Sequence, residues 1–310
     1  MRKVIGIGET LLDIIFKDNK PVEAVPGGST FNAIVSLGRV GANAFFVTET
    51  GDDHVGALVR SFLSSNNVCT DYVLERKGWK SPVSLAFLDS DNNANYTFYR
   101  DPNADPVDIP LPDINSDDIV LFGSFYAVSP ATRARVIALL ERARDCGAII
   151  YYDVNFRPSH RGDVMKVTPN LIENLEFADI VRGSRDDFEV LYKKDSAERV
   201  YRAETSFYCP RLVYTDGPRP VTVFSDGGFR KEYAMPETPT VSTIGAGDNF
   251  NAGLICAMLR YDIRRADIER GLTEAEWSKL IESATAFSAD CCKDIFNYIS
   301  TDFGESLKSQ

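Results

Sequence analysis

Short apolar runs alternate along the chain with longer segments in which apolar residues recur every three or four positions. The runs of strand length cover residues 4–7, 44–47, 119–122, 149–152, 180–181 and 212–214. Helical spacing is clearest over residues 130–146 and 245–260. Strands that alternate with helices in this way predict an α/β fold with a doubly wound, mostly parallel sheet flanked by helices.

Two segments break this rhythm. Residues 10–25 and 81–101 have strand-like patterns, and residues 89–93, which are only Asp, Ser and Asn, have the composition of a hairpin turn. We expect these segments to form a small β-sheet that stands off the main sheet as a lid. Since the chain has no internal repeat or flexible linker, residues 1–310 are expected to fold as a single domain that carries this lid.

The balance of charged residues bears on whether the chain binds a polyanion such as nucleic acid. The chain has 44% hydrophobic and 25% charged residues, as in ordinary globular proteins. Its 34 Lys and Arg against 45 Asp and Glu give a net charge of -11, which argues against nucleic acid as the main ligand. Acidity also serves solubility, so the charge by itself names no partner.

The cysteines and the N-terminus indicate a compartment. The six cysteines are Cys69, Cys146, Cys209, Cys256, Cys291 and Cys292. They form no Cys-x-x-Cys pair and have no His cluster beside them, so we expect reduced thiols and no zinc site. The chain begins with a strand-like run and contains no apolar stretch long enough for a membrane span or signal peptide. A cytoplasmic protein without membrane association is expected.

The most informative motif is Gly245-Ala246-Gly247-Asp248, which lies between an extended segment and a helix. Glycines at such a point let a phosphate approach the backbone, and the unpaired N–H groups and dipole of the helix start favour negative charge. A carboxylate in a first turn also stabilises a helix without any chemistry. These four residues alone leave both interpretations open.

The longer stretch over residues 242–250 reads Ser-Thr-Ile-Gly-Ala-Gly-Asp-Asn-Phe. It resembles the C-terminal signature of the ribokinase-like, or PfkB, carbohydrate kinases, which is approximately Asp-Thr-x-Gly-Ala-Gly-Asp. The resemblance implies a ribokinase-like fold and ATP-dependent phosphorylation of a small sugar. It further implies that Asp248 deprotonates the sugar hydroxyl, while the amides of Gly245, Ala246 and Gly247 stabilise charge on the transferred phosphoryl group.

The family's N-terminal signature is similar to residues 26–33, Pro-Gly-Gly-Ser-Thr-Phe-Asn-Ala. Gly27 and Gly28 let the backbone lie against a ligand, and Asn32 can donate to and accept from sugar hydroxyls. A turn followed by a capped helix start is the alternative. Residues 6–13, Gly-Ile-Gly-Glu-Thr-Leu-Leu-Asp, resemble the family's first strand and substrate loop, and by resemblance Asp13 accepts hydrogen bonds from vicinal sugar hydroxyls.

Two further motifs resemble the fructokinase-like and 2-keto-3-deoxygluconate kinase-like branches. Residues 153–158 follow a strand at the edge where α/β sheets bind ligands. There the resemblance implies that Arg157 contacts the substrate or γ-phosphate and that Asn155 contacts the substrate or lies near the phosphates or their magnesium. At the end of the second lid strand, Phe98 would cover the sugar's apolar face and Arg100 its polar edge. A loop of solvated polar residues is the alternative for residues 153–158, and a sheet that is packed on one side only is the alternative for Phe98 and Arg100.

ATP and magnesium contacts are expected at two other strand ends. Thr215 and Gly217 match a family Thr-x-Gly turn against the nucleotide, although a plain β-turn has the same residues. Ser184 and Asp187 take the places of the family's Asn-x-x-Glu, which organises Mg²⁺ through water. Oxygen ligands suit that hard cation. A helix N-cap with acidic residues in the first turn is the alternative there.

Potassium activation is doubtful for this chain. Many relatives have Asp at the start of the C-terminal signature, and in ribokinase-type members it helps to hold a potassium-binding loop. Ser242 stands at that position here. The late loop, rich in Gly and Ala in those relatives, reads Cys-Cys-Lys-Asp-Ile-Phe-Asn-Tyr-Ile-Ser over residues 291–300.

Several functions stay open after these comparisons of motifs. The leading expectation is a kinase of fructose acting on a terminal hydroxyl, with 2-keto-3-deoxygluconate, ribose or a nucleoside as alternative substrates. A non-catalytic sugar-binding regulator on the same scaffold is an alternative from another class. A nicotinamide-dependent oxidoreductase would need a third glycine after Gly6-x-Gly8, which is missing. The expected partners are a sugar and ATP, and the lid strands either pair in a homodimer or only cover the pocket.

Overall fold

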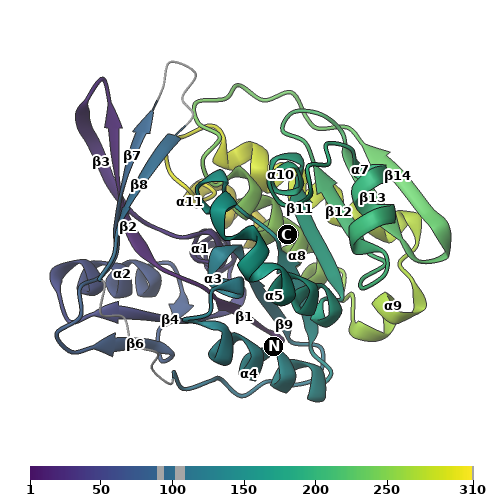
Figure 1. Ribbon diagram of the computed structural model, residues 1–310, viewed down its shortest axis with the longest axis horizontal. Coiled ribbons are helices and arrows are strands. Elements are labelled where there is room, and N and C mark those ends of the chain that lie inside the picture. Colours follow the sequence, from purple (N-terminus) through teal and green to yellow (C-terminus); the bar gives the residue numbers. More distant parts are fainter. Residues whose placement is uncertain (89–93, 102–108, 309–310) are drawn as a thin grey trace.

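The computed structural model describes residues 1–88, 94–101 and 109–308. The hairpin turn expected at residues 89–93 lies outside the described residues. The doubly wound sheet predicted from the sequence is confirmed, and it runs through the centre of the molecule (Figure 1). Its strands are β1 (Lys3–Ile7), β4 (Asn43–Gly51), β5 (Val68–Cys69), β6 (Val73–Arg76), β9 (Ile119–Gly123), β10 (Ile149–Asp153), β11 (Ile180–Ser184), β12 (Leu212–Thr215), β13 (Val221–Ser225) and β14 (Phe229–Tyr233).

The strand order is β14-β13-β12-β11-β10-β9-β1-β4-β5, with β6 also paired to β4. Pairing is parallel from β12 to β5, while β12, β13 and β14 pair in antiparallel fashion. In this topology the central parallel strands all end at one edge of the sheet. Loops that follow them are thereby brought together at that edge.

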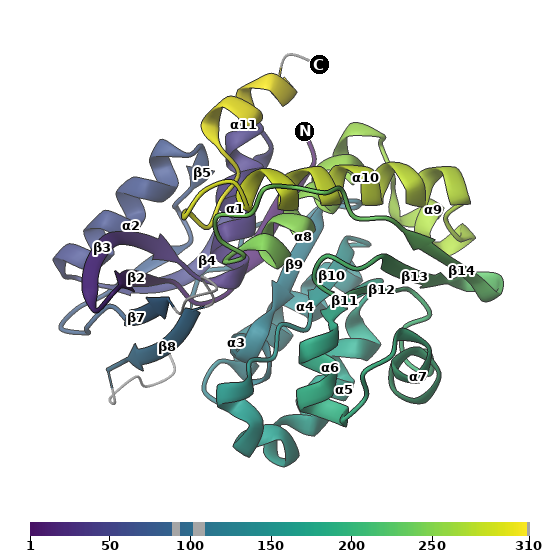
Figure 2. The same cartoon turned by 90° about the horizontal axis from the view of Figure 1, so that it is seen from above.

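Successive residues of the central strands enter two different cores, because side chains alternate across a strand. In β10, Ile149 and Tyr151 face one core, and Ile150 and Tyr152 face the other. Figure 2 shows the helices on both faces of the sheet. The first core is covered by α1 (Ser29–Arg39), α2 (His54–Ser65), α8 (Ala246–Arg260), α9 (Arg265–Arg270), α10 (Glu274–Cys291) and α11 (Thr301–Lys308). The second is covered by α3 (Ser124–Val128), α4 (Arg133–Asp145), α5 (Val164–Phe177), α6 (Arg185–Tyr192) and α7 (Ala197–Val200).

A separate small sheet stands off one end of the molecule (Figure 1). It consists of β2 (Leu11–Lys17), β3 (Lys20–Gly27), β7 (Val83–Leu88) and β8 (Ala94–Tyr99), in the order β3-β2-β7-β8. Leu11, Asp13 and Ile15 of β2 lie on its buried face. The strand-like segments expected from the sequence are therefore present, and a polar residue stands among apolar ones on the face that points inward.

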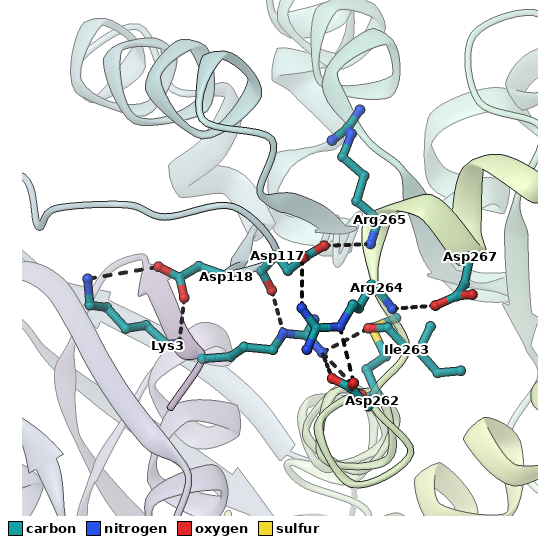
Figure 3. Close-up of polar contacts among 10 residues, drawn as sticks. Lys3, Asp117, Asp118, Asp262, Ile263, Arg264, Arg265 and Asp267 are labelled. Carbon is teal, nitrogen blue, oxygen red and sulfur yellow. Dashed lines mark hydrogen bonds and ion pairs between the residues drawn. The ribbon is translucent and has the colours of Figure 1, made fainter.

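Charged groups form contacts at the edge of the main sheet where β1 and β9 begin (Figure 3). The main-chain N–H of Arg265 donates to Asp117 Oδ1 at 2.9 Å, and Arg264 Nη1 lies 3.2 Å from Asp117 Oδ2. Beside them the main-chain N–H of Lys3 donates to Asp118 Oδ1 at 2.7 Å. These contacts hold the connection between α8 and α9 against the starts of β1 and β9. Among the described residues, no helix is both long and apolar enough to cross a bilayer.

Candidate active site

Two adjoining cavities open at the edge where β9, β10 and β11 end. The first has a volume of about 340 Å³ and the second of about 590 Å³. Both volumes are typical of sites for small molecules. The residues that line both cavities are Tyr96, Asn155, Arg157, Pro158, Ile244, Gly245 and Asp248.

Asp248 lies in the first turn of α8, at the junction of the two cavities. The residue is 4% exposed; Oδ2 accepts a hydrogen bond from Asn32 Nδ2 at 2.8 Å and Oδ1 accepts one from Asn155 Nδ2 at 3.4 Å. Burial raises the pKa of this carboxyl to about 6, while Arg157 lowers the pKa and Asp153 raises it. A carboxyl of this kind is ionised at neutral pH and can accept a proton there.

The start of α8 has the backbone shape of an anion site. Gly245 precedes the helix with a φ of 76°, a left-handed conformation that favours glycine, and a side chain there would meet the Asn297 carbonyl oxygen at 2.7 Å. A Cβ on Gly247 would lie 2.9 Å from the Arg182 guanidinium. The Ala246 N–H donates to the Thr243 carbonyl at 3.2 Å. Within the described residues the N–H groups of Gly245, Gly247 and Asp248 have no backbone acceptor, so those of the two glycines are among the ones that remain for a ligand.

Asp13 faces the first cavity from β2. Its carboxylate accepts a hydrogen bond from the Ser84 hydroxyl and another, at 3.3 Å, from Asn297 Nδ2, while the backbone of Gly27 packs against it. Burial raises the pKa of Asp13 to about 6, and the hydrogen bonds from Ser84 and Asn297 oppose that shift. Gly28, the next residue along the chain, lines the same cavity. The carboxylate is thus fixed in position before any ligand arrives.

Phe98 and Arg100 enter the first cavity from the end of β8. The Arg100 guanidinium lies 5.3 Å from the centre of the Phe98 ring and 2.6 Å from Glu9 Oε2. Tyr96 stacks on Phe98 with the ring centres 5.8 Å apart. This wall therefore combines an aromatic surface with a cation.

Asn155 and Arg157 follow β10 and lie between the cavities. Asn155 Nδ2 donates to Ser29 Oγ at 2.6 Å, which holds the loop against the start of α1. The Arg157 guanidinium makes no hydrogen bond or ion pair with any residue that the structure describes, and it lines both cavities. A cation placed in this way is available to an anion.

Ser184 and Asp187 line the second cavity as the capping box of α6. Asp187 Oδ2 accepts from the Ser184 N–H at 2.7 Å, and Oδ1 accepts from the Phe156 N–H at 2.8 Å. Since both oxygens already accept hydrogen bonds, the geometry fits contact with Mg²⁺ through water better than direct ligation. In the described part of the chain, no three His, Cys, Asp or Glu residues form a group that could hold a metal ion by themselves.

The structure does not bring every candidate residue to a cavity wall. Gly27 and Ala246 lie directly behind the walls, in the contacts given above. Thr215 and Gly217 line neither cavity: Thr215 Oγ1 accepts a hydrogen bond from Arg182 Nη2 at 2.7 Å, and Gly217 is exposed on the following turn. Their contact with ATP stays a prediction.

Arg182 is a candidate that the sequence patterns missed. It lines the second cavity from β11, with its side chain 8% exposed, and Nη1 donates to Asp153 Oδ1 at 3.0 Å. The same guanidinium lies directly behind Gly247. Burial raises the pKa of Asp153 even though Arg182 opposes the shift. An arginine within an apolar strand run was the available signal, because arginine is seldom buried unless it is paired.

Asn297 is the second missed candidate. It lies in the late loop between α10 and α11, lines the first cavity and contacts Asp13. That loop has no periodic pattern, and nothing local marks this asparagine. The contact joins residues 284 positions apart along the chain.

Comparison with known proteins finds relatives that match most of this chain. The model of the "pfkB family carbohydrate kinase" matches residues 1–293. The probable fructokinase-6, chloroplastic, of Arabidopsis thaliana is 25% identical over 285 residues, which cover 88% of this chain and 74% of that protein.

Two solved structures share the whole fold. The aminoimidazole riboside kinase from Salmonella enterica, complexed with aminoimidazole riboside and an ATP analog, has a TM-score of 0.84 at 20% identity, with 99% of each chain covered. The fructokinase from Vibrio cholerae O395 in its fructose, ADP and calcium ion bound form has a TM-score of 0.85 at 18% identity, again with 99% of each chain covered. The fold is therefore the ribokinase-like α/β fold.

Proposed function

This chain belongs to the pfkB family of carbohydrate kinases and is an ATP-dependent sugar kinase, and we propose that it phosphorylates fructose on a terminal hydroxyl to give fructose 6-phosphate. The observation that carries the proposal is the place of Asp248, a buried carboxylate at the junction of two cavities and at the start of a helix. One cavity then holds the sugar and the other the phosphates. Relatives named as fructokinases, at about 25% identity, favour fructose.

Asp248 accepts the proton of the sugar hydroxyl as the hydroxyl oxygen attacks the γ-phosphorus and the bond to the leaving ADP oxygen breaks. The N–H groups of Gly245 and Gly247 stabilise the charge on the phosphoryl oxygens from one side, and the Arg157 guanidinium does so from the other. Phosphoryl transfer has a loose transition state, so positioning and charge stabilisation matter more than the strength of the base. Asp248, Gly245 and Arg157 line both cavities, which supports these roles.

The first cavity has the polarity that a polyol needs. Asp13 is a buried acceptor, and the Oδ1 atom of Asn32 is buried without a partner among the described residues. Sugar hydroxyls would satisfy both acceptors, and an unsatisfied buried acceptor is costly. Phe98 supplies an apolar surface for the sugar's C–H face.

The second cavity has the charge that ATP and its cation need. ATP supplies the γ-phosphoryl group, and Mg²⁺, when bound, offsets the charge of the phosphates. Asp187 would hold that cation through water, beside Ser184. Thr215 and Gly217 would approach the nucleotide from the next strand end.

The small sheet would serve as the lid of the first cavity, since Asp13, Phe98 and Arg100 reach that cavity from it. Its outer strands β3 and β8 each have one unpaired edge in the described sheet, which is the kind of edge that a second copy can extend. A homodimer through this lid and a monomer with the same lid both fit the proposed reaction.

A coupled ADP-release assay tests the proposal directly. The panel contains fructose, 2-keto-3-deoxygluconate, ribose and a nucleoside, each with and without Mg²⁺. The expected result is magnesium-dependent ADP release with kcat/KM highest for fructose. A higher kcat/KM for another sugar would replace fructose by that sugar, and sugar binding without ADP release would favour a sugar-binding regulator.

A further inference from the structure

The late loop between α10 and α11 crosses from the helix that covers the first core to the wall of the first cavity. Asn297 is the residue of this loop that reaches the cavity, and it is 1% exposed. No step of the proposed reaction uses it. In a buried side-chain amide, both the N–H and the C=O groups are expected to have hydrogen-bond partners.

The amide nitrogen of Asn297 has a partner and the amide oxygen has none. Nδ2 donates to Asp13 Oδ2 at 3.3 Å. Because an ionised carboxylate can only accept, the NH₂ group must face Asp13 and Oδ1 must face away from it. Among the described residues Oδ1 has no hydrogen-bond donor, although the atom is buried.

The loop holds Asn297 rigidly in this position. The Asn297 carbonyl accepts from Asn249 Nδ2 at 2.8 Å, the Tyr298 hydroxyl donates to the Pro26 carbonyl, and the Ile299 N–H donates to Ser36 Oγ at 3.2 Å. These anchors lie on α8, β3 and α1. The backbone at Asn297 is therefore fixed, and turning the side-chain amide away from the cavity would break its hydrogen bond to Asp13.

We propose that Asn297 is a sugar-binding residue. Its NH₂ group positions Asp13, and its Oδ1 accepts a hydrogen bond from a sugar hydroxyl. This hydroxyl is next to one that donates a hydrogen bond to Asp13. The site then has a further acceptor beside Asp13 for neighbouring hydroxyl donors. Because this names a further contact of the same sugar site, it rests on the proposed function. The expected substrate is a sugar with vicinal hydroxyls at that point, and a deoxy analogue that lacks one of them binds less well.

Three variants test the role of Asn297. Asn297→Ala removes both polar groups, and Asn297→Asp keeps the shape but sets a second carboxylate against Asp13. Tyr298→Phe is the matched control, because it removes an anchor of the same loop and leaves the Asn297 amide in place. Sugar affinity is measured by calorimetry without nucleotide, KM values for sugar and ATP by ADP release, and folding by thermal melting.

We expect Asn297→Ala to raise the sugar Kd and KM about tenfold to 100-fold, which is the usual effect of leaving a buried polar partner unpaired. Asn297→Asp should raise them further, while the ATP KM stays within about threefold of wild type. Tyr298→Phe should leave the sugar Kd within about threefold. Against a panel of monodeoxy sugars, one analogue should bind wild type less well than the parent sugar and yet bind Asn297→Ala as well as the parent does.

Unchanged sugar Kd in both Asn297 variants would overturn the proposal, and so would an equal loss in Tyr298→Phe, which would indicate a purely structural loop. If Asn297→Ala does not fold, the shape-conserving Asn297→Asp and the deoxy panel on wild type decide the question. Failure of the proposed function looks different: wild type would then release no ADP with any sugar, while the calorimetric comparison of the variants would still give its own answer.

Discussion

Asn32 and Asp248 are 216 residues apart in sequence, yet Asn32 Nδ2 donates to Asp248 Oδ2 at 2.8 Å. The contact joins the starts of α1 and α8, which are the two helices that carry the glycine-rich signatures. It occupies Oδ2, whereas Oδ1 accepts a longer hydrogen bond of 3.4 Å from Asn155, and a hydrogen bond from the Ser29 side chain lowers the pKa of the same carboxyl. The Asp248 carboxyl is thus held in position from the start of α1.

Asp248→Asn should keep the fold and the sugar Kd but lower kcat by about 10²- to 10⁴-fold, because the amide cannot accept the proton. Steady-state ADP release and calorimetric sugar binding measure the two quantities. The control is Asp145→Asn, which changes an exposed carboxylate near the end of α4 and should leave kcat unchanged. A rate within a few-fold of wild type in Asp248→Asn would rule out Asp248 as the base.

The pH dependence follows from the burial of Asp248. Burial raises its pKa to about 6, and the reaction needs the ionised form, so kcat should fall as the pH drops through about 6. Arg157 lowers this pKa, so the residual activity of Arg157→Gln should begin to fall at a higher pH than that of wild type. A pH–rate profile from pH 5 to 9 measures the acid limb of wild type and of Arg157→Gln. An acid limb that moves to lower pH in Arg157→Gln would contradict the assignment.

Arg182→Met should lower kcat about 100-fold, because it removes a cation behind Gly247. It should also destabilise the protein by about 3 to 5 kcal/mol, since Asp153 loses its buried partner. The double variant Asp153→Leu with Arg182→Met separates the two effects: its stability should recover, because apolar pairs replace buried ion pairs well. Its kcat should stay low, and recovery of kcat together with stability would show that Arg182 acts only through the fold.

Gly247→Ala should reduce kcat more than it raises the sugar KM, because the added Cβ would lie 2.9 Å from the buried Arg182 guanidinium, so that either this cation or the first turn of α8 must move. A displacement of about 1 Å at such a place can cost on the order of 100-fold in rate. Gly162→Ala is the matched control, since a Cβ there meets nothing within 4 Å. Equal kinetics in the two variants would show that the start of α8 does not need this close approach.

Replacement of potassium by a large organic cation should change kcat by less than about twofold. Ser242 is buried, and its hydroxyl accepts a hydrogen bond from the Ile244 N–H at 3.2 Å. The main-chain N–H of Val241 donates to the Cys292 carbonyl at 2.8 Å, which joins this segment to the late loop directly. ADP release at constant ionic strength measures the effect, and a many-fold loss would show that the chain uses potassium after all.

Local patterns were sufficient for much of this architecture. The apolar runs at residues 149–152 and 119–122 became β10 and β9 because a strand buried on both faces needs apolar residues at every position. The helix expected from residue 130 begins instead at Arg133, since the Pro130 segment forms a turn first. The antiparallel β13–β14 pair was not predicted, because its alternating pattern gave no sign of its partner.

The residues of the candidate site also divide into those that sequence patterns predict and those that they do not. Asp248 and Asn32 were found because each lies in a glycine-rich motif at a helix start. Arg182 and Asn297 were not, because their importance comes from contacts with Gly247 and Asp13 that only the folded chain creates. Sequence patterns report what neighbours in the chain do together, and these contacts join distant segments.

The parallel pairing of β2 with β7 has a consequence for how the protein folds. Asp13 and Ser84 are 71 residues apart, and α1, β4 and α2 lie between the two strands in the chain. A parallel pair of such long separation forms slowly, because the loop must close before the contact is gained. The parallel pair β1–β9 of the main sheet joins Val4 to Ile119, a still longer separation, so the main sheet and the wall that carries Asp13 both depend on long-range pairing and a chain that lacks either would lack the sugar site.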